Sequence, residues 1–267
     1  MDLFIAWLER IGGNLVTDLE RYLVLAIGVW FVLWVMLSRF IWFRKVRSEW
    51  PPREQMVSEL LHSLRSIAIF SVFSSLIWVL YEAQWLPWAD VNAQMTGPWW
   101  FWGSIAVTIL CHDAYFYWVH RWMHSPKRFR LYHRRHHKSM NPSPFTAYSF
   151  DLREAALMVI FVVGFEILVP NAHGSTGMFI VIQLVKNTLA HSGFELMPAR
   201  RDGKPMFDFF TTTVHHDLHH ARAGYNFGLY FTWWDRWMGT EDPTYHAEFK
   251  RVVQQRKNQK LPEAVAA

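Results

Sequence analysis

Residues 22–43 read YLVLAIGVWFVLWVMLSRFIWF and contain one charged side chain, that of Arg39. An α-helix needs about 20 predominantly apolar residues to cross the hydrocarbon core of a bilayer. This stretch therefore predicts a membrane-spanning helix and indicates an integral membrane protein. The preceding residues, 1–21, have an amphipathic pattern that predicts a helix lying in the membrane interface.

Three further apolar stretches support this interpretation. Residues 66–81 and 91–112 carry no Lys, Arg, Asp or Glu, and 155–190 carries only two. The last stretch is interrupted at 170–174, which predicts a helical hairpin. One such stretch alone would also suit a buried helix of a soluble protein. Four of them in 267 residues favour an all-α, polytopic membrane protein with a helical bundle of about four passes.

The basic residues indicate how this bundle is oriented. Four Lys or Arg residues lie in 44–57, eight in 121–153 and ten in 198–267, whereas 82–98 and 170–177 contain none. Because cytoplasmic loops carry an excess of Lys and Arg, the three basic segments are predicted to share the cytoplasmic side. We expect the inner membrane if the chain is bacterial and the endoplasmic reticulum if it is eukaryotic.

The composition shows that a polar part accompanies the helices. Hydrophobic residues make up 52% of the chain, yet the mean hydropathy is only +0.02. The net charge of +5 is mild, and basic residues are not interleaved with aromatic ones as in a nucleic-acid module, so we expect no nucleic-acid partner. The single cysteine, Cys111, excludes a disulfide framework and an iron–sulfur cluster. Any metal would therefore be held by imidazole and carboxylate groups.

The 14 histidines are the second unusual feature of the chain. Most of them form sets spaced by three and four residues, which places their imidazoles on one helix face. The three sets, and one further histidine at the end of the hairpin, are His120 and His124; His133, His136 and His137; His216, His219 and His220; and His191. All of them lie on the predicted cytoplasmic side or close to it, which chance spacing does not explain.

A metal centre accounts for this clustering. Crowded imidazoles repel one another when protonated and are costly to bury without partners, and a metal ion removes both problems. Nine histidines exceed what one ion accepts and fit two ions that share them. Imidazole suits zinc, copper, iron and nickel, but a hydrolytic zinc site needs far fewer histidines. Below a lipid-facing bundle we favour two iron ions with O2 as co-substrate, with zinc able to replace iron in purified samples.

Longer motifs around the histidines resemble a known family. They are 112–124 (HDAYFYWVHRWMH), 133–139 (HRRHHKS), 215–220 (HHDLHH), 226–231 (NFGLYF) and 233–240 (WWDRWMGT). The first three resemble the histidine boxes, and the last two the tail, of the fatty acid hydroxylase/sterol desaturase superfamily of membrane-bound di-iron oxidoreductases. Within it the chain looks nearest to the sterol C5-desaturase branch. The resemblance covers roughly 100–245, more than half of the chain.

The resemblance implies a four-helix-type transmembrane bundle capped by a cytosolic, histidine-rich helical domain with two metals. It also implies a lipid substrate and a small electron-transfer partner that is cytochrome b5-like or ferredoxin-like. Carried over by position, the expected metal ligands are His120, His124, His133, His136, His137, His191, His216, His219 and His220. Asp151 departs from the pattern, since many relatives have a His after Ser-Phe. Glu195 stands near another ligand position of some relatives, which leaves a tenth ligand open.

Three polar residues beside the boxes carry weaker signals. Asp113 lies two helical turns before His120 on nearly the same face, so its carboxylate is expected to hold an imidazole N–H behind the metal. A polar residue at the membrane boundary is the alternative. On an ideal helix His112 points about 80° away from His120, and His215 about 100° away from His216, so neither is expected to be a ligand.

Together these patterns predict three parts of the chain. They are N-terminal membrane helices (1–98), a histidine-box catalytic domain that includes the membrane hairpin (99–245) and a basic polar tail (246–267). The favoured function is an oxygen-dependent oxidoreductase that desaturates or hydroxylates a sterol-like or long-chain lipid. The alternative is a non-enzymatic metal carrier or sensor. A carrier would place ionisable ligands inside its spanning helices, whereas these histidines lie outside the lipid core.

Overall fold

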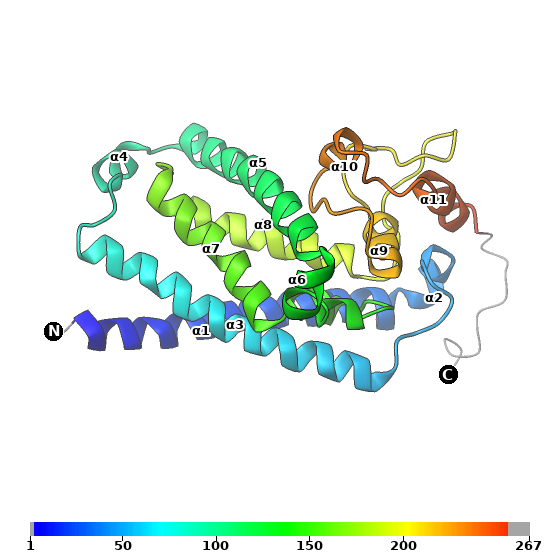
Figure 1. Ribbon diagram of the computed structural model, residues 1–267, viewed down its shortest axis with the longest axis horizontal. Coiled ribbons are helices and arrows are strands. Elements are labelled where there is room, and N and C mark those ends of the chain that lie inside the picture. The colour runs from blue at the N-terminus through cyan, green and yellow to red at the C-terminus, as the bar shows by residue number, and fades with distance from the viewer. Residues whose placement is uncertain (1–2, 256–267) are drawn as a thin grey trace.

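The computed structural model describes residues 3–255, and over that range the chain consists of helices and irregular segments without a strand (Figure 1). The predicted all-α class is therefore confirmed, while the end of the predicted tail, 256–267, lies outside the described residues. The long helices are α1 (Leu3–Trp30), α3 (Arg53–Glu82), α5 (Pro98–Met123), α7 (Leu152–Leu168) and α8 (Ser175–Ala190). The short α-helices are α2 (Ser38–Ile41), α4 (Ala89–Gln94), α6 (Pro126–Tyr132), α9 (Thr213–Arg222), α10 (Trp233–Trp237) and α11 (Tyr245–Val253). A π-helix, η1 (Phe31–Met36), and three 3-10 helices, η2 (Trp42–Arg44), η3 (His136–Lys138) and η4 (Pro144–Tyr148), complete the set.

α1 and α3 form an antiparallel pair held by polar contacts. The indole N–H of Trp7 donates to Ser75 Oγ (2.8 Å), and Ser71 Oγ donates to Asp18 Oδ2 (3.0 Å). α1 also runs directly into η1. The N-terminal amphipathic pattern therefore belongs to one long helix and does not form the separate interfacial helix that we predicted. Polar side chains of its N-terminal part form hydrogen bonds with serines of α3, as Asn14 does with Ser74.

Two helical segments, Phe4–Met36 and Arg53–Glu82, are long and apolar enough to cross a membrane. The hairpin predicted over 155–190 is present as α7 and α8, which have 17 and 16 residues. Each is about 25 Å long at about 1.5 Å per residue, which barely matches a bilayer core of about 30 Å. The break between them ends at Gly174, whose positive φ of 78° suits glycine. Four passes and a cytosolic histidine domain stay predictions.

The long helices expose large apolar side chains on their outer surface. The exposed fraction is 91% for Trp99 on α5, 70% for Val24 on α1 and 73% for Leu168 on α7. Apolar surface of this extent is unusual for a soluble monomer and suits helices that contact lipid. The chain thus has the surface of a membrane protein.

The short helices gather at one end of the bundle, where α9, α10 and α11 lie beyond the end of α8 (Figure 1). Val214 and Leu218 of α9 pack against Tyr245 and Phe249 of α11 in a buried apolar core. α8 packs against both α5 and α9. The C-terminal ends of α5 and α8 are thereby brought to the same place as α9, and these are the elements that carry histidines.

Candidate metal centre

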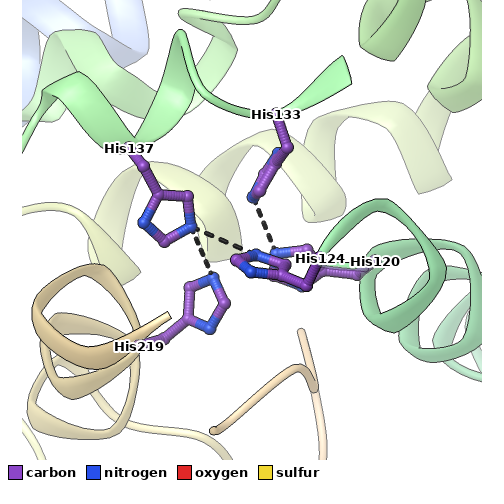
Figure 2. A group of neighbouring side chains, drawn as sticks. All are labelled: His120, His124, His133, His137 and His219. Atoms are coloured by element: carbon purple, nitrogen blue, oxygen red, sulfur yellow. Dashed lines mark hydrogen bonds between the residues drawn. The ribbon is translucent and has the colours of Figure 1, made fainter. Parts of the chain in front are cut away.

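All nine predicted ligands converge at this end of the bundle, in two groups. Within each group the ligand atoms lie within 4.8 Å of one another. The five-histidine group contains His120, His124, His133, His137 and His219, and Figure 2 shows their rings turned toward one another. The four-histidine group contains His136, His191, His216 and His220.

Four segments deliver these side chains. α5 supplies two near its C-terminus, the segment from the end of α6 through η3 supplies three, the residue after α8 supplies one and α9 supplies three. Along α9 the histidines are spaced by three and four residues, so they lie on one side of the helix. η3 places consecutive histidines in different groups, because neighbouring residues on a helix point in different directions.

Three rings of the five-histidine group have their Nδ1 atom fixed by an oxygen. The pairs are His120 with the Phe227 carbonyl (2.9 Å), His133 with the Glu154 carboxylate (2.6 Å) and His219 with the Tyr225 carbonyl (2.6 Å). A backbone carbonyl only accepts, so Nδ1 of His120 and of His219 carries the proton and donates it, and an ionised Glu154 carboxylate accepts from Nδ1 of His133 in the same way. In a neutral imidazole the other nitrogen, Nε2, then has a bare lone pair.

The Nε2 atoms of this group face one another. Nε2 of His120 lies 2.9 Å from Nε2 of His133, and Nε2 of His137 lies 3.0 Å from that of His219 and 3.2 Å from that of His124 (Figure 2). Two opposed lone pairs, as in His120 and His133, repel and form no hydrogen bond. Two nitrogens bound about 2.0–2.1 Å from one ion, at angles of about 90–110°, would be about 2.9–3.4 Å apart. The arrangement therefore fits a metal ion between the rings.

His191 is the centre of the four-histidine group. Its Nδ1 donates to the Asn187 carbonyl (2.8 Å), which leaves Nε2 bare. That atom lies 2.9 Å from Nε2 of His216, 3.2 Å from that of His220 and 3.3 Å from that of His136. One lone pair cannot form hydrogen bonds to three nitrogens at once, whereas an ion shared by four nitrogens accounts for all three distances.

Burial keeps these imidazoles in the form that binds metal. Eight of the nine are buried and His124 is half-buried. Desolvation lowers the pKa of His137 to about 2 and the pKa values of His191 and His219 to about 4. A metal ligand must be a neutral imidazole, so the rings need not lose a proton near pH 7. An all-nitrogen donor set of this kind suits iron, zinc, copper or nickel.

Glu154 is a functional residue that our sequence reasoning missed. It lies in the first turn of α7, is 2% exposed and accepts the Nδ1 hydrogen of His133. A carboxylate behind a ligand imidazole fixes the ring orientation and makes the ligand more basic. The signal in the sequence was one acidic residue at the start of an apolar stretch, a position that also suits any helix N-terminus.

The role expected for Asp113 is corrected by its contacts. Its carboxylate accepts the backbone N–H groups of Tyr230 (3.1 Å) and Phe231 (3.3 Å) and the indole N–H of Trp233 (2.7 Å). Within residues 3–255 no imidazole is among its hydrogen-bond partners. Asp113 therefore holds the segment before α10 against α5. The carboxylate that contacts a ligand imidazole is that of Glu154.

The remaining polar candidates lie outside both groups. Nδ1 of His112 is 3.0 Å from the hydroxyl oxygen of Tyr230, and the His215 ring is buried without a hydrogen-bond partner among the described residues. Glu195 accepts two backbone N–H groups. Neither Glu195 nor Asp151 joins a histidine group, so the described residues provide no tenth ligand there.

A cavity of about 920 Å³ lies among α1, α3, α4, α5, α7 and α8. Phe116 and Phe150 are part of its wall, and each also contacts one histidine group. The ring centroid of Phe116 is 5.0 Å from that of His120, and the ring centroid of Phe150 is 5.4 Å from that of His136. The cavity has the size of a small-molecule site, and a single aromatic side chain separates it from each histidine group.

Comparison with known proteins gives a consistent result. Residues 105–240 match the protein family described as fatty acid hydroxylase. A Delta(7)-sterol 5(6)-desaturase of Gibberella zeae is 29% identical over 167 residues, which cover 59% of this chain and 49% of the relative. A Delta(7)-sterol 5(6)-desaturase of Leptosphaeria maculans is 25% identical over 226 residues, covering 84% and 61%.

Methylsterol monooxygenase 1 of Rattus norvegicus is 29% identical over 141 residues, which cover 52% of this chain and 46% of the relative. The chain thus spans about half to three-fifths of the length of these three relatives. No solved structure shows a significant match to it.

Proposed function

The chain belongs to the fatty acid hydroxylase family, and on that basis we propose that it is an oxygen-dependent, di-iron lipid oxidoreductase. It would desaturate or hydroxylate a sterol-like or long-chain lipid. The observation that carries the proposal is the convergence of bare imidazole nitrogens in two groups, one aromatic layer from a cavity in an apolar bundle.

The five-histidine group would hold one iron and the four-histidine group the other. When bound, such a pair supplies the activation of O2 that oxidation of an unactivated C–H bond requires. The protein's own groups hold the ligands in place. Glu154 and three backbone carbonyls fix the Nδ1 hydrogens of His133, His120, His219 and His191, so that the Nε2 atoms keep their directions without reorganisation.

The cavity would determine the outcome of the reaction. Its walls hold the substrate, and Phe116 and Phe150 keep bulk water from the ligand nitrogens on that side. Hydroxylation and desaturation need the same ligands and begin with removal of one hydrogen, but hydroxylation then adds oxygen to that carbon, whereas desaturation removes a second hydrogen from the neighbouring carbon. We therefore place the choice between the two reactions in the shape of this cavity.

For the whole molecule we infer about four membrane passes, with the histidine end in the cytoplasm. The parts would be the membrane helices (1–98), the catalytic domain (99–245) and the polar tail (246–267). The eight and ten basic residues of 121–153 and 198–267 support this orientation. They would also attract a small, acidic electron carrier of the cytochrome b5 or ferredoxin type.

Single cysteines would test this orientation in a Cys111→Ser background. Arg201→Cys should react with a membrane-impermeant thiol reagent only from the cytoplasmic side, and Asp90→Cys only from the opposite side. Sealed vesicles of known sidedness, labelled before and after permeabilisation, give the measurement. Labelling of both positions from one side would contradict the proposed topology.

The metal centre is tested by metal analysis of the detergent-purified full chain. We expect about two metal ions per chain, and fewer in His136→Ala. His62→Ala is the matched control, because its imidazole lies outside both groups and forms a hydrogen bond with the Ser58 carbonyl. Lipid profiles of cells with wild type, His136→Ala and no protein would then identify the oxidised lipid. A metal-free wild type with full activity would overturn the proposal.

A further inference from the structure

α1 turns a polar face toward the cavity. Arg10, Asn14, Asp18 and Arg21 line it at spacings of four, four and three residues, which is one side of a helix. The opposite walls, from α5 and α7, are mainly apolar and include Phe116, Met158, Val159 and Val162. Charged side chains in a candidate spanning helix are costly, so their presence beside a cavity points to a ligand.

Arg21 has unused hydrogen-bonding capacity in this cavity. A guanidinium carries five N–H donors, and among the described residues the one hydrogen-bond partner of Arg21 is Asp18, at 3.4 Å. Its Nη2 atom points toward α8, where a Cβ atom on Gly177 would lie 4.0 Å away. The Asp18 carboxylate accepts from Ser71 and Arg21 and has further lone pairs. The pair therefore offers a donor and an acceptor side by side.

The charges around the cavity select the kind of ligand. The wall contains two cations, Arg10 and Arg21, and three acidic groups, Asp18, Glu82 and Glu166, a formal sum of two minus three, or −1. A carboxylate or phosphate head group would be repelled by this excess. A hydroxyl is neutral and both donates and accepts, which matches the Asp18–Arg21 pair.

We propose that Asp18 and Arg21 bind the hydroxyl group of a neutral lipid alcohol, whose apolar body lies along α5 and α7 toward Phe116 and Phe150. This inference rests on the proposed function and names the substrate class of the same site. Gly177, which faces Arg21, precedes His191 by fourteen residues, or about 21 Å along a helix. The oxidised carbon is therefore remote from the hydroxyl group.

Equilibrium binding to the full chain in lipid nanodiscs tests the inference. The probes are hexadecanol, hexadecanoic acid and hexadecane, which share one chain length and differ in the head group. Wild type should bind the alcohol most tightly. Arg21→Gln should weaken binding of the alcohol by about tenfold, the effect of one hydrogen bond to a charged group, and leave the alkane unchanged. The control, Glu20→Gln, removes an exposed charge from the same helix and should change neither.

Asp18→Asn provides a second variant with a different signature. It should weaken binding of the alcohol but tighten binding of the acid, because it removes a negative charge from the cavity wall; a purely structural role for Asp18 would weaken both. Tighter binding of the acid than of the alcohol by wild type, or equal alcohol binding by Arg21→Gln and Glu20→Gln, would overturn the inference. Iron content measured on the same samples separates the two proposals, since a metal-free wild type contradicts the di-iron function and leaves the binding result intact.

Discussion

At the scale of single residues, His191 connects the other three members of its group. Its Nε2 atom is within 3.3 Å of three other imidazole nitrogens, and it takes no part in the five-histidine group. We predict that His191→Ala loses one metal and keeps the other, so that the purified chain carries about one metal ion where wild type carries two. Metal analysis by mass spectrometry is the measurement. Loss of both ions, or of neither, would contradict the division into two groups.

Glu154 gives a prediction for the group that holds His133. Glu154→Gln keeps an oxygen for the Nδ1 hydrogen of His133 but removes the negative charge that makes the imidazole more basic. We expect the metal affinity of the five-histidine group to fall by about 10–100-fold, the usual effect of losing such a partner. Competition with a coloured chelator measures the affinity. Glu248→Gln, which removes a charge paired with Arg251 on the exposed face of α11, is the control and should bind like wild type.

The histidines could be predicted from the sequence because their spacing is local. Residues three and four apart share a helix face wherever the helix lies, which describes the histidines of α5 and α9. The same expectation was wrong for His133, His136 and His137, because 133–135 form a turn and η3 directs His136 and His137 into different groups. Glu154 could not be found in this way, since it reaches His133 only when the start of α7 packs beside the end of α6. The expectation for Asp113 placed it correctly on the face of His120 but could not foresee that Tyr230 covers that face.

At the scale of elements, the segment between α9 and α10 supports the metal centre. The Phe227 carbonyl holds His120, and the N–H groups of Phe227 and Gly228 donate to the Asp235 carboxylate. A Cβ atom on Gly228 would lie 2.6 Å from the Phe231 carbonyl oxygen and 2.9 Å from Asp235 Oδ2. This segment has no room for a side chain at that point.

We therefore predict that Gly228→Ala destabilises the protein by about 1–3 kcal/mol, the usual cost of overpacking, and weakens metal retention by shifting the Phe227 carbonyl. Thermal unfolding and metal content are the two measurements. Gly103→Ala is the control, because no atom lies within 4 Å of its Cβ position on α5. There the substitution should leave metal content unchanged and stabilise the helix by about 0.5–1 kcal/mol. Equal effects of the two substitutions would contradict this account.

The N-terminal helix shows where prediction of an element fails. Its apolar part was visible from composition, but the amphipathic residues before it suit either a membrane interface or a partner helix. Packing against α3 decides between them, through contacts such as that of Asp18 with Ser71, 53 positions later in the chain. A local sequence pattern does not contain contacts between residues so far apart in the chain.

At the scale of the whole molecule, the two groups join parts of the chain that are far apart. The nine ligands extend from His120 to His220 and come from four segments. These side chains are close enough to share a metal ion only in the folded state. The free energy of metal binding therefore adds to the free energy of unfolding. Each ion present at 100 times its dissociation constant would stabilise the fold by about 2.7 kcal/mol, so two ions would contribute about 5.4 kcal/mol.

Removal of both metals should therefore lower the melting temperature by about 11 °C or more, taking about 2–4 °C per kcal/mol for a chain of this size. Differential scanning fluorimetry before and after dialysis against a chelator measures the change, and adding Fe(II) under anaerobic conditions should restore it. The same treatment of His136→Ala should have a smaller effect. An unchanged melting temperature in wild type would contradict a metal-linked fold.

At this scale the cavity could not be predicted from the sequence. Its wall combines residues from six α-helices, and Arg21, Phe116 and Gln183 approach one space only after the bundle is assembled. The apolar runs predicted the helices, and the histidine spacing predicted the ligands. Which residues of different helices become neighbours depends on which helix faces pack together. The periodicity within one helix does not specify those faces.

The order of the ligands along the chain also bears on how the protein is made. The last of them, His220, follows the end of α8, the final long helix. During synthesis the long helices are therefore made before either histidine group is complete. If the two groups hold metal as proposed, loading would be the closing step of biosynthesis, and chains that lack metal would be less stable and more open to proteases. The amount of the protein would then follow the supply of that metal.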